Sequence, residues 1–168
     1  MTRELPDDVE IGAGDTDEAA VLADLWIELA DGQRRYGSHL RAEPNRTPIH
    51  ETMLQHAVTG TVLVARRDDA VVGFVTFGVG SGRYRQDTTR GTIHNLYVRK
   101  RARGAGIGGA LLTAAEDALA SMDVETVSLE AMAGNDAARS FYSRHGYAPH
   151  RIELEKPIND DHVTTDED

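Results

Sequence analysis

The feature that most constrains this chain is a glycine-rich segment between a β-rich run and a helical pattern. Arg103-Gly-Ala-Gly-Ile-Gly-Gly109 follows the β-rich run Thr92–Val98 and precedes apolar residues at helical spacing up to about Met122. Glycine lacks a Cβ, so its backbone reaches positive φ and a ligand can come close. Consecutive amides then converge at the positive end of a helix dipole. The segment therefore predicts an anion site, and a pyrophosphate suits it best.

The same glycines permit a second interpretation. Gly104, Gly106 and Gly109 match Gly-x-Gly-x-x-Gly, the dinucleotide fingerprint, and Glu130 lies where a ribose-binding acid could sit. A dinucleotide fold usually begins with this motif, whereas here a predicted hairpin precedes it. Only about 60 residues follow, too few for the second half of a doubly wound sheet.

Composition indicates one globular domain. The 168 residues suit a single core, 40% of them are apolar, and no apolar run approaches the length of a membrane span. The polar, acidic N-terminus does not resemble a signal peptide, and the absence of cysteine excludes disulfides and thiolate chemistry. We therefore expect one cytoplasmic domain over residues 1–168, with a flexible acidic tail over 158–168.

The net charge is −10, and the basic residues include only two lysines, Lys100 and Lys156. Such an Asp-rich, Lys-poor surface resembles that of proteins from salt-accumulating halophiles, in which high charge maintains solubility and salt screens the repulsion. This charge balance argues against nucleic acid as the main partner, because a phosphate backbone requires clustered positive charge.

Apolar periodicity predicts the elements around the loop. Asp15 and Glu18 have capping-box spacing at the start of the first helix, and Pro48 suits the first turn of the second. The expected strands are Val9–Ile11, Thr61–Arg66, Val71–Val79, Thr92–Val98, Glu125–Ala131 and Tyr147–Glu155, and the expected helices are 15–30, 48–58, 107–122 and 135–145. Strand–helix–strand units near the C-terminus favour parallel pairing there, and the earlier hairpin is antiparallel. The result is a mixed α/β sheet with helices on both faces.

Two C-terminal motifs carry a family resemblance. Arg103-Gly-Ala-Gly-Ile-Gly108 resembles the Arg/Gln-x-x-Gly-x-Gly/Ala signature of the GNAT superfamily of N-acetyltransferases. Asn135-Asp-Ala-Ala-Arg-Ser-Phe-Tyr-Ser-Arg-His-Gly-Tyr147 and the hairpin from Val64 to Phe74 are also similar to that family. The resemblance covers roughly 15–155. It implies a mostly antiparallel central sheet, with a splayed strand pair that holds acyl-CoA.

The resemblance also implies a cofactor site. Amides of the glycine-rich loop would hold the pyrophosphate of coenzyme A, and the strand over 95–98 would hold the pantetheine arm by backbone hydrogen bonds. Backbone donors there could also polarise the thioester carbonyl. The implied cofactor-binding residues are Leu96, Tyr97, Val98, Arg103, Gly104, Ala105, Gly106, Ile107, Gly108, Gly109, Asn135 and Tyr142. Asn135 could equally be a plain helix N-cap.

The implied reaction is direct attack of a primary amine on acetyl-CoA, with no metal and no covalent enzyme intermediate. Tyr142 matches the tyrosine proposed in the family to protonate the departing thiolate. His94 stands where many relatives carry an acidic residue and could act as the base, although a strand histidine with a structural hydrogen bond or a water relay fits equally well. A β-bulge in this strand would change the direction of His94.

The acceptor is not identified by the sequence. In the family the first helix pair shapes the acceptor site, here about Trp26 to His56, where Arg34, Arg35, Arg41 and Arg46 could favour an acidic substrate or could be scattered surface charge. A small-molecule or peptide amine is expected, homodimers being common in the family. The sequence thus predicts an acetyl-CoA-dependent N-acetyltransferase. An acyl-CoA sensor without turnover and a dinucleotide-binding domain remain as alternatives.

Overall fold

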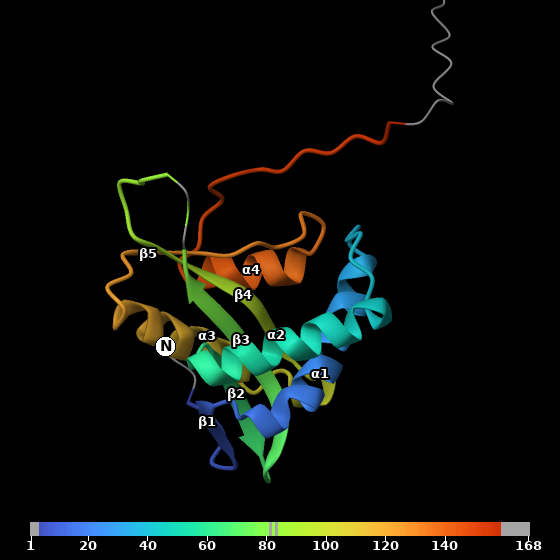
Figure 1. Cartoon of the computed structure of the whole chain (residues 1–168), viewed down its shortest axis with the longest axis vertical. Helices are drawn as coiled ribbons and strands as arrows, with labels where there is room; N and C mark the ends of the chain where they lie inside the picture. The colour runs from blue at the N-terminus through green and yellow to red at the C-terminus, as the bar shows by residue number, and fades with distance from the viewer. Residues whose placement is uncertain (1–3, 81, 83, 159–168) are drawn as a thin grey trace, which may run out of the picture.

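A computed structural model describes residues 4–80, 82 and 84–158, and in it one five-stranded sheet organises the chain (Figure 1). The strand order is β1-β2-β3-β4-β5; the first four pair antiparallel, and β5 is parallel to β4. The elements are β1 Val9–Ala13, η1 Thr16–Glu18, α1 Ala19–Arg34, η2 Glu43–Asn45, α2 Arg46–Thr59, β2 Val62–Arg67, β3 Ala70–Val79, β4 Arg90–Val98, η3 Lys100–Ala102, α3 Ile107–Ala120, β5 Thr126–Ser128 and α4 Asp136–Arg144. The mixed α/β sheet predicted from the sequence is confirmed.

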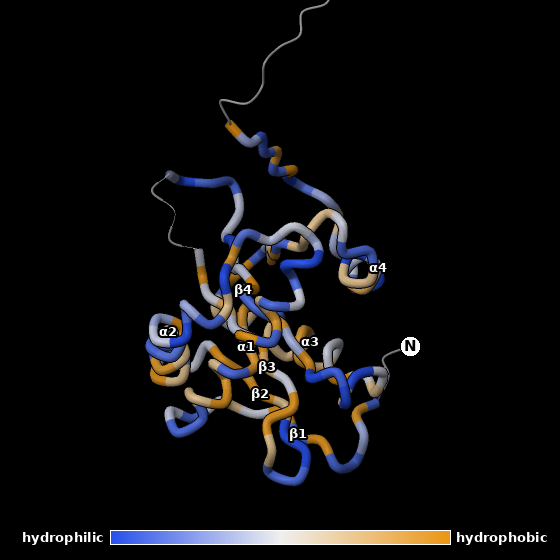
Figure 2. The backbone as a smooth tube through the Cα atoms, turned by 90° about the vertical axis from the view of Figure 1, so that its right-hand side faces the viewer, coloured by the Kyte–Doolittle hydropathy of each residue, from blue (hydrophilic) through white to orange (hydrophobic). Residues whose placement is uncertain are grey.

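Two apolar cores lie on opposite faces of the sheet, and the strands at its centre run through both (Figure 2). On one face α1 and α2 pack on β2 and β3, with Leu25, Met53 and Phe74 among the fully buried side chains. On the other face α3 packs through Leu111, and α4 adds its aromatic residues. Because β3 is covered on both sides, its residues 71–77 are all buried rather than alternating.

Local sequence signals explain several element boundaries. The backbone amide of Asp15 donates to Glu18 at 2.9 Å, as capping-box spacing predicts, although a 3₁₀ turn precedes α1. Asp68 and Asp69 both have positive φ, which is the geometry of a tight two-residue hairpin between β2 and β3. The predicted hairpin and helix order are therefore confirmed, with shifts of a few residues.

The strand predicted over Tyr147–Glu155 is absent from the described structure. Residues 148–158 contain no helix or strand and are exposed, and the segment runs away from the sheet (Figure 1). Alternation of apolar and polar residues predicts an extended segment, but a strand also needs backbone hydrogen bonds to a neighbouring strand, and residues 148–158 make none with the described residues. The predicted strand 125–131 is likewise reduced to β5. The tail expected to be flexible falls, apart from Ile158, outside the described residues. Within the described ranges, no helix has the length and apolar character needed to cross a bilayer.

Gly73 in β3 sets how closely the sheet packs beneath α3. A Cβ there would lie 2.9 Å from the carbonyl oxygen of Tyr97 and 3.2 Å from Leu111. Since the first contact is backbone, it cannot rotate away. We expect Gly73→Ala to lower the free energy of unfolding by about 1–3 kcal/mol in denaturant titration. Gly32→Ala, in α1 with no atom within 4 Å of the new Cβ, should leave stability unchanged or raise it by up to about 1 kcal/mol; equal losses in both variants would contradict this account of the packing.

Candidate active site

The glycine-rich loop forms a group of free backbone donors at the start of α3. Gly104 and Gly106 both have φ of +83°, and the helix begins directly afterwards at Ile107. The first amide with a partner in the helix is that of Ala110, which donates to the Gly106 carbonyl at 3.1 Å. For the amides from Gly104 to Gly109, no acceptor occurs among the described residues. Unpaired amides at a helix N-terminus fit a bound pyrophosphate.

Arg103 is held at the edge of this loop. Its Nε donates to the Val98 carbonyl at 2.9 Å, and its guanidinium lies 5.4 Å from the centre of the Tyr97 ring. These contacts fix the end of β4 and keep positive charge next to the free amides. At the other side of the loop, His145 of the α4 C-cap lies against Gly109, where a Cβ would approach its Nε2 to 3.1 Å.

Strands β4 and β5 diverge in front of the loop. They pair only from Arg90↔Thr126 to Thr92↔Ser128, although β4 continues to Val98. Beyond Thr92, no described residue pairs with β4 on that side, so its backbone groups are available to a ligand. This is the splayed strand pair that the sequence resemblance implied. Of the predicted pantetheine-binding residues, Leu96 lines the resulting cleft, while the Tyr97 side chain is buried on the opposite face of the sheet, in the α1 core.

A β-bulge lies in β4 at His94. Opposite β3 the register changes between Thr76↔Asn95 and Phe77↔Ile93, which leaves His94 as the extra residue. Ile93 stays buried, and Asn95 donates to the Thr76 hydroxyl at 2.9 Å. The bulge thus allows His94 and Asn95, which follow each other, both to line the cleft.

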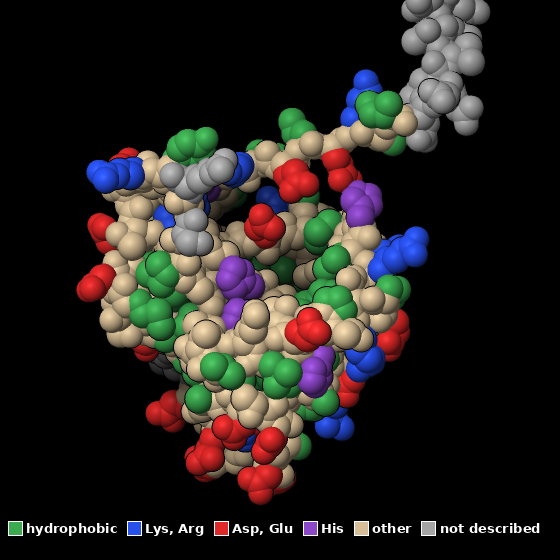
Figure 3. All heavy atoms as spheres, viewed as in Figure 1, with side chains coloured by type: hydrophobic (Ala, Val, Ile, Leu, Met, Phe, Trp, Pro, Cys, Tyr) green, Lys and Arg blue, Asp and Glu red, His purple; other side chains and the backbone are tan. Residues whose placement is uncertain are grey.

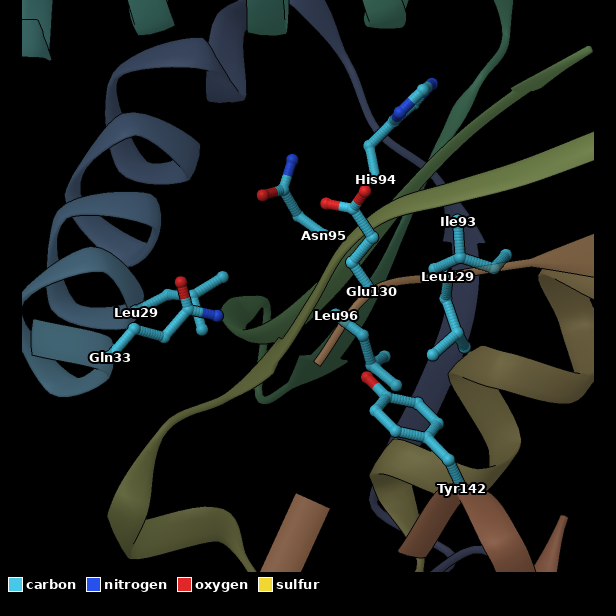
Figure 4. A pocket seen from close by; sticks show the side chains of 9 residues that line it. All are labelled: Leu29, Gln33, Ile93, His94, Asn95, Leu96, Leu129, Glu130 and Tyr142. Carbon is cyan, nitrogen blue, oxygen red and sulfur yellow. The ribbon is translucent and has the colours of Figure 1, made fainter. Parts of the chain in front are cut away.

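The cleft itself measures about 40 Å³, room for one or two water molecules. The face seen in Figure 3 is hollowed between its acidic and histidine side chains. Figure 4 shows contributions from α1, β4, α4 and the segment after β5. The lining residues are Leu29, Gln33, Ile93, His94, Asn95, Leu96, Leu129, Glu130 and Tyr142. Both predicted catalytic residues, His94 and Tyr142, therefore reach one cleft.

Tyr142 enters the cleft from α4 with its hydroxyl toward Leu96 (Figure 4). Burial raises the pKa of this phenol, so it remains a proton donor at neutral pH. Its ring makes edge contacts with Phe141 and Tyr147, at centroid distances of 5.2 and 5.9 Å. Asn135 does not line the cleft; its side chain accepts from the Ala138 amide at 3.1 Å and caps α4, as the N-cap alternative predicted.

The ring of His94 points away from Tyr142 in Figure 4. It is exposed and lies 6.0 Å, centre to centre, from His56 of α2. His56 is half-buried and its Nδ1 shares a 2.7 Å hydrogen bond with Thr61. Burial, together with the neighbouring His94, lowers the pKa of His56. The lowered pKa favours the neutral form of His56, the ring that lies beside His94 at the border of the cleft.

The structure adds residues to the cleft that the sequence analysis missed. Among the described residues that line it, Glu130, considered above only as a ribose ligand, supplies the carboxylate. Leu29 and Gln33 of α1 fall within the segment Trp26 to His56 that the resemblance implied for the acceptor. His50, which also belongs to the segment Trp26 to His56, does not line this cleft and lies in a separate groove between α1 and α2. The spacing of apolar residues predicts which face of α1 is buried, but it does not predict which side chains of α1 lie next to the residues that follow β5.

The arginines considered for an acidic acceptor are mostly engaged elsewhere. Arg46 pairs with Asp24 and Glu43, and Arg34 donates to the carbonyls of His39 and Leu40. None of the four arginines lines the cleft. Arg46 instead lines the separate groove between α1 and α2, and the carboxylate of Glu130 is among the groups that line the cleft.

Comparisons with known proteins agree with this geometry. Residues 25–147 match a family model described as Acetyltransferase (GNAT) family. A curated relative, an uncharacterized N-acetyltransferase of Methanocaldococcus jannaschii, is 37% identical over 90 residues, 53% of each chain, so the match spans about half of that relative. A crystal structure of a GCN5-related N-acetyltransferase from Ralstonia eutropha JMP134 has a TM-score of 0.71 and 25% identity, covering 89% of this chain and 98% of the other.

A PaiA N-acetyltransferase from Thermoplasma acidophilum, solved in complex with coenzyme A, has a TM-score of 0.69 and 18% identity, covering 86% of this chain and 92% of the other. At this identity the likeness concerns the fold alone. Since the family model covers most of the chain, the protein belongs to the acetyltransferase (GNAT) family. The predicted family and acetyltransferase class are confirmed, and the dinucleotide-binding interpretation does not hold.

Proposed function

We propose that this protein is an N-acetyltransferase that binds acetyl-CoA at the loop from Arg103 to Gly109 and transfers the acetyl group to an amine held in the adjacent cleft. The observation that carries the proposal is the run of amides from Gly104 to Gly109 for which the described residues supply no acceptor, beside a strand pair, β4 and β5, that separates after Thr92. Buried or converging amides need partners, and a pyrophosphate supplies acceptor oxygens and negative charge together.

The remainder of the cofactor would follow β4. Backbone groups of the strand beyond Thr92 face the gap left by β5, so they can hydrogen-bond an extended amide-containing arm in the manner of an added strand. The coenzyme A bound by the Thermoplasma relative supports the choice of cofactor. Bound acetyl-CoA would supply an activated acetyl group as a thioester, which an uncharged amine can attack directly.

The acceptor amine would enter the cleft as a cation. Glu130 brings negative charge to a cleft whose other lining residues include Gln33 and Asn95, both neutral, so an ammonium group is favoured over an anion. Before attack the nitrogen must lose a proton, and His94 at the same cleft can accept it through Nδ1 or Nε2, directly or through water. We therefore assign Glu130 to acceptor binding and His94 to proton removal.

Tyr142 would complete the transfer. As the new C–N bond forms, the C–S bond breaks and negative charge develops on sulfur. The Tyr142 hydroxyl, kept protonated by burial, can donate its proton there. The ammonium thus loses two protons: His94 takes the first before attack, and the positively charged nitrogen releases the second to water once the C–N bond has formed. Tyr142 gives one proton to the departing thiolate, and exchange with water restores both side chains, so that one proton is released overall. We place this activity in one cytosolic domain.

Removal of the Tyr142 hydroxyl should slow turnover. We expect Tyr142→Phe to lower kcat by about 10²-fold with little change in the KM for acetyl-CoA, because one acid catalyst typically contributes that factor. A thiol-release assay with a panel of primary amines measures this. Tyr36→Phe removes a hydroxyl outside the cleft and serves as the control. Unchanged kcat in Tyr142→Phe would remove Tyr142 as the acid, whereas binding of acetyl-CoA by the unaltered protein without thiol release from any amine would favour an acyl-CoA sensor over an enzyme.

Substitutions of His94 and Glu130 should have different kinetic effects, because one group accepts a proton and the other attracts the charge of the acceptor. We expect His94→Ala to lower kcat/KM at least tenfold and to remove the acid limb of its pH profile, since the proton acceptor is lost. Glu130→Gln should mainly raise the KM for a cationic acceptor, because charge attraction is lost while size is kept. His50→Ala, in the groove between α1 and α2, is the control. An unchanged pH profile in His94→Ala would remove His94 from the mechanism.

A further inference from the structure

A chain of hydroxyl groups at the end of α2 fixes the proton positions on His56. The Thr59 hydroxyl donates to the Gln55 carbonyl at 2.9 Å. Oγ1 of Thr61 lies 2.8 Å from this hydroxyl and 2.7 Å from Nδ1 of His56. Each hydroxyl has a single hydrogen to donate. Since the hydrogen of Thr59 goes to the carbonyl, that of Thr61 goes to Thr59, and the contact with His56 requires a hydrogen on Nδ1.

The hydrogen on Nδ1 leaves Nε2 of neutral His56 as a proton acceptor. The residue lies in the last turn of α2, where the helix carbonyls favour a positive charge. Burial, and next the neighbouring His94, lowers the pKa of His56. His56 is therefore neutral at neutral pH, and it is placed so that it can take up a proton for a short time.

His94 borders both the cleft and this imidazole. The centres of the two rings are 6.0 Å apart, a separation that one water molecule can bridge. Gly78 of β3 makes room for the His94 ring, because a Cβ there would lie 3.2 Å from its Nε2. In Figure 4 the ring points away from Tyr142. His94 can thus take a proton on one nitrogen and release one from the other toward α2.

We propose that His56 is a positioning residue that acts through His94 by receiving, on Nε2 and through water, the proton that His94 takes from the acceptor ammonium. The inference rests on the proposed role of His94 as the base. At His94 one N–H bond forms while another breaks, so this ring returns to its neutral form. His56 becomes an imidazolium ion and then releases its proton to solvent. Bound substrates would cover the cleft side of His94, and the α2 side gives the proton a way out.

The charges around the two rings decide how many protons the pair holds. Among the described residues that line the cleft beside His94, Glu130 from the segment after β5 is charged, whereas Gln33 of α1 and Asn95 of β4 are neutral. On the side of α2 the groups next to His56 are neutral hydroxyls. Two imidazolium ions at this distance repel each other, so the pair takes up a second proton less readily than the first. Both rings must therefore be neutral before the transfer begins.

An NMR titration of the unliganded protein tests the pair without reference to turnover. We expect the ring nitrogen shifts of His56 to show the tautomer protonated on Nδ1. His94→Asn should raise the titration midpoint of His56 by about half a pH unit, since a positive charge 6.0 Å away is lost. His50→Asn, on the same helix but in the separate groove, should leave the midpoint unchanged. A proton on Nε2 instead, or a midpoint that does not respond to His94→Asn, would overturn the proposal.

Kinetics test whether the pair works in the reaction. His56→Asn keeps a donor for Thr61 near the place of Nδ1 and removes the acceptor at Nε2. We expect kcat to fall about tenfold with an unchanged KM for acetyl-CoA. The slope of log kcat on the acid side of the pH profile should fall from about 2 to about 1, because only one group must then be neutral. Loss of a purely structural contact would leave this slope unchanged.

Two threonine variants supply a matched control. Thr61→Val removes the hydroxyl that fixes the tautomer of His56, so we expect a smaller loss of kcat than in His56→Asn. Thr52→Val, on the same helix, removes a hydroxyl bonded to the Pro48 carbonyl at 3.0 Å and should leave kcat unchanged. An active enzyme whose kcat and acid slope are the same in His56→Asn would overturn this inference alone. Absence of thiol release from the unaltered protein with every amine would instead overturn the proposed function and the proton path together.

Discussion

The hydrogen-bonding requirement of the backbone at the start of α3 is the constraint on which the site depends. A helix leaves its first amides without internal partners, and here the loop before it extends that unpaired run back to Gly104. Positive φ at Gly104 and Gly106 is what lets these amides face one point. The sheet must therefore place the end of β4 next to this loop, and the hydrogen bond from Arg103 to the Val98 carbonyl holds the strand end there.

The second requirement is that β4 separate from β5 without loss of the sheet. Pairing over only three positions holds the two strands together at one end, and the bulge at His94 changes the direction of β4 where they part. Hydrophobic packing on both faces of the sheet compensates for the hydrogen bonds that β4 and β5 do not make beyond Thr92, because β3 is covered on each side. The cleft lies where α1, β4 and α4 meet this gap, and in the proposed reaction its acidic side receives the amine while Tyr142 faces the leaving group.

Much of this architecture could be predicted from the sequence because its signals are local. The glycines of the loop, the Asp68-Asp69 turn and the cap at Asn135 act within a few residues, and each appears where expected. The composition of the cleft could not be predicted in the same way. Glu130 and Gln33 come together only through tertiary packing, and the fate of residues 147–155 depends on a partner edge that periodicity does not reveal. The sequence left both roles of Arg46 open for the same reason, since its partner Asp24 is on another helix.

The central claim is that the loop binds the pyrophosphate of an acyl-CoA, and calorimetric titration tests it most directly. The account predicts that acetyl-CoA binds the purified protein in molar KCl, that NADH does not, and that Gly106→Val abolishes binding while circular dichroism shows the fold retained. Valine cannot adopt the positive φ of this position without strain, so the amides would no longer face one point. Binding of NADH, of neither ligand, or of acetyl-CoA unchanged by Gly106→Val would contradict the account.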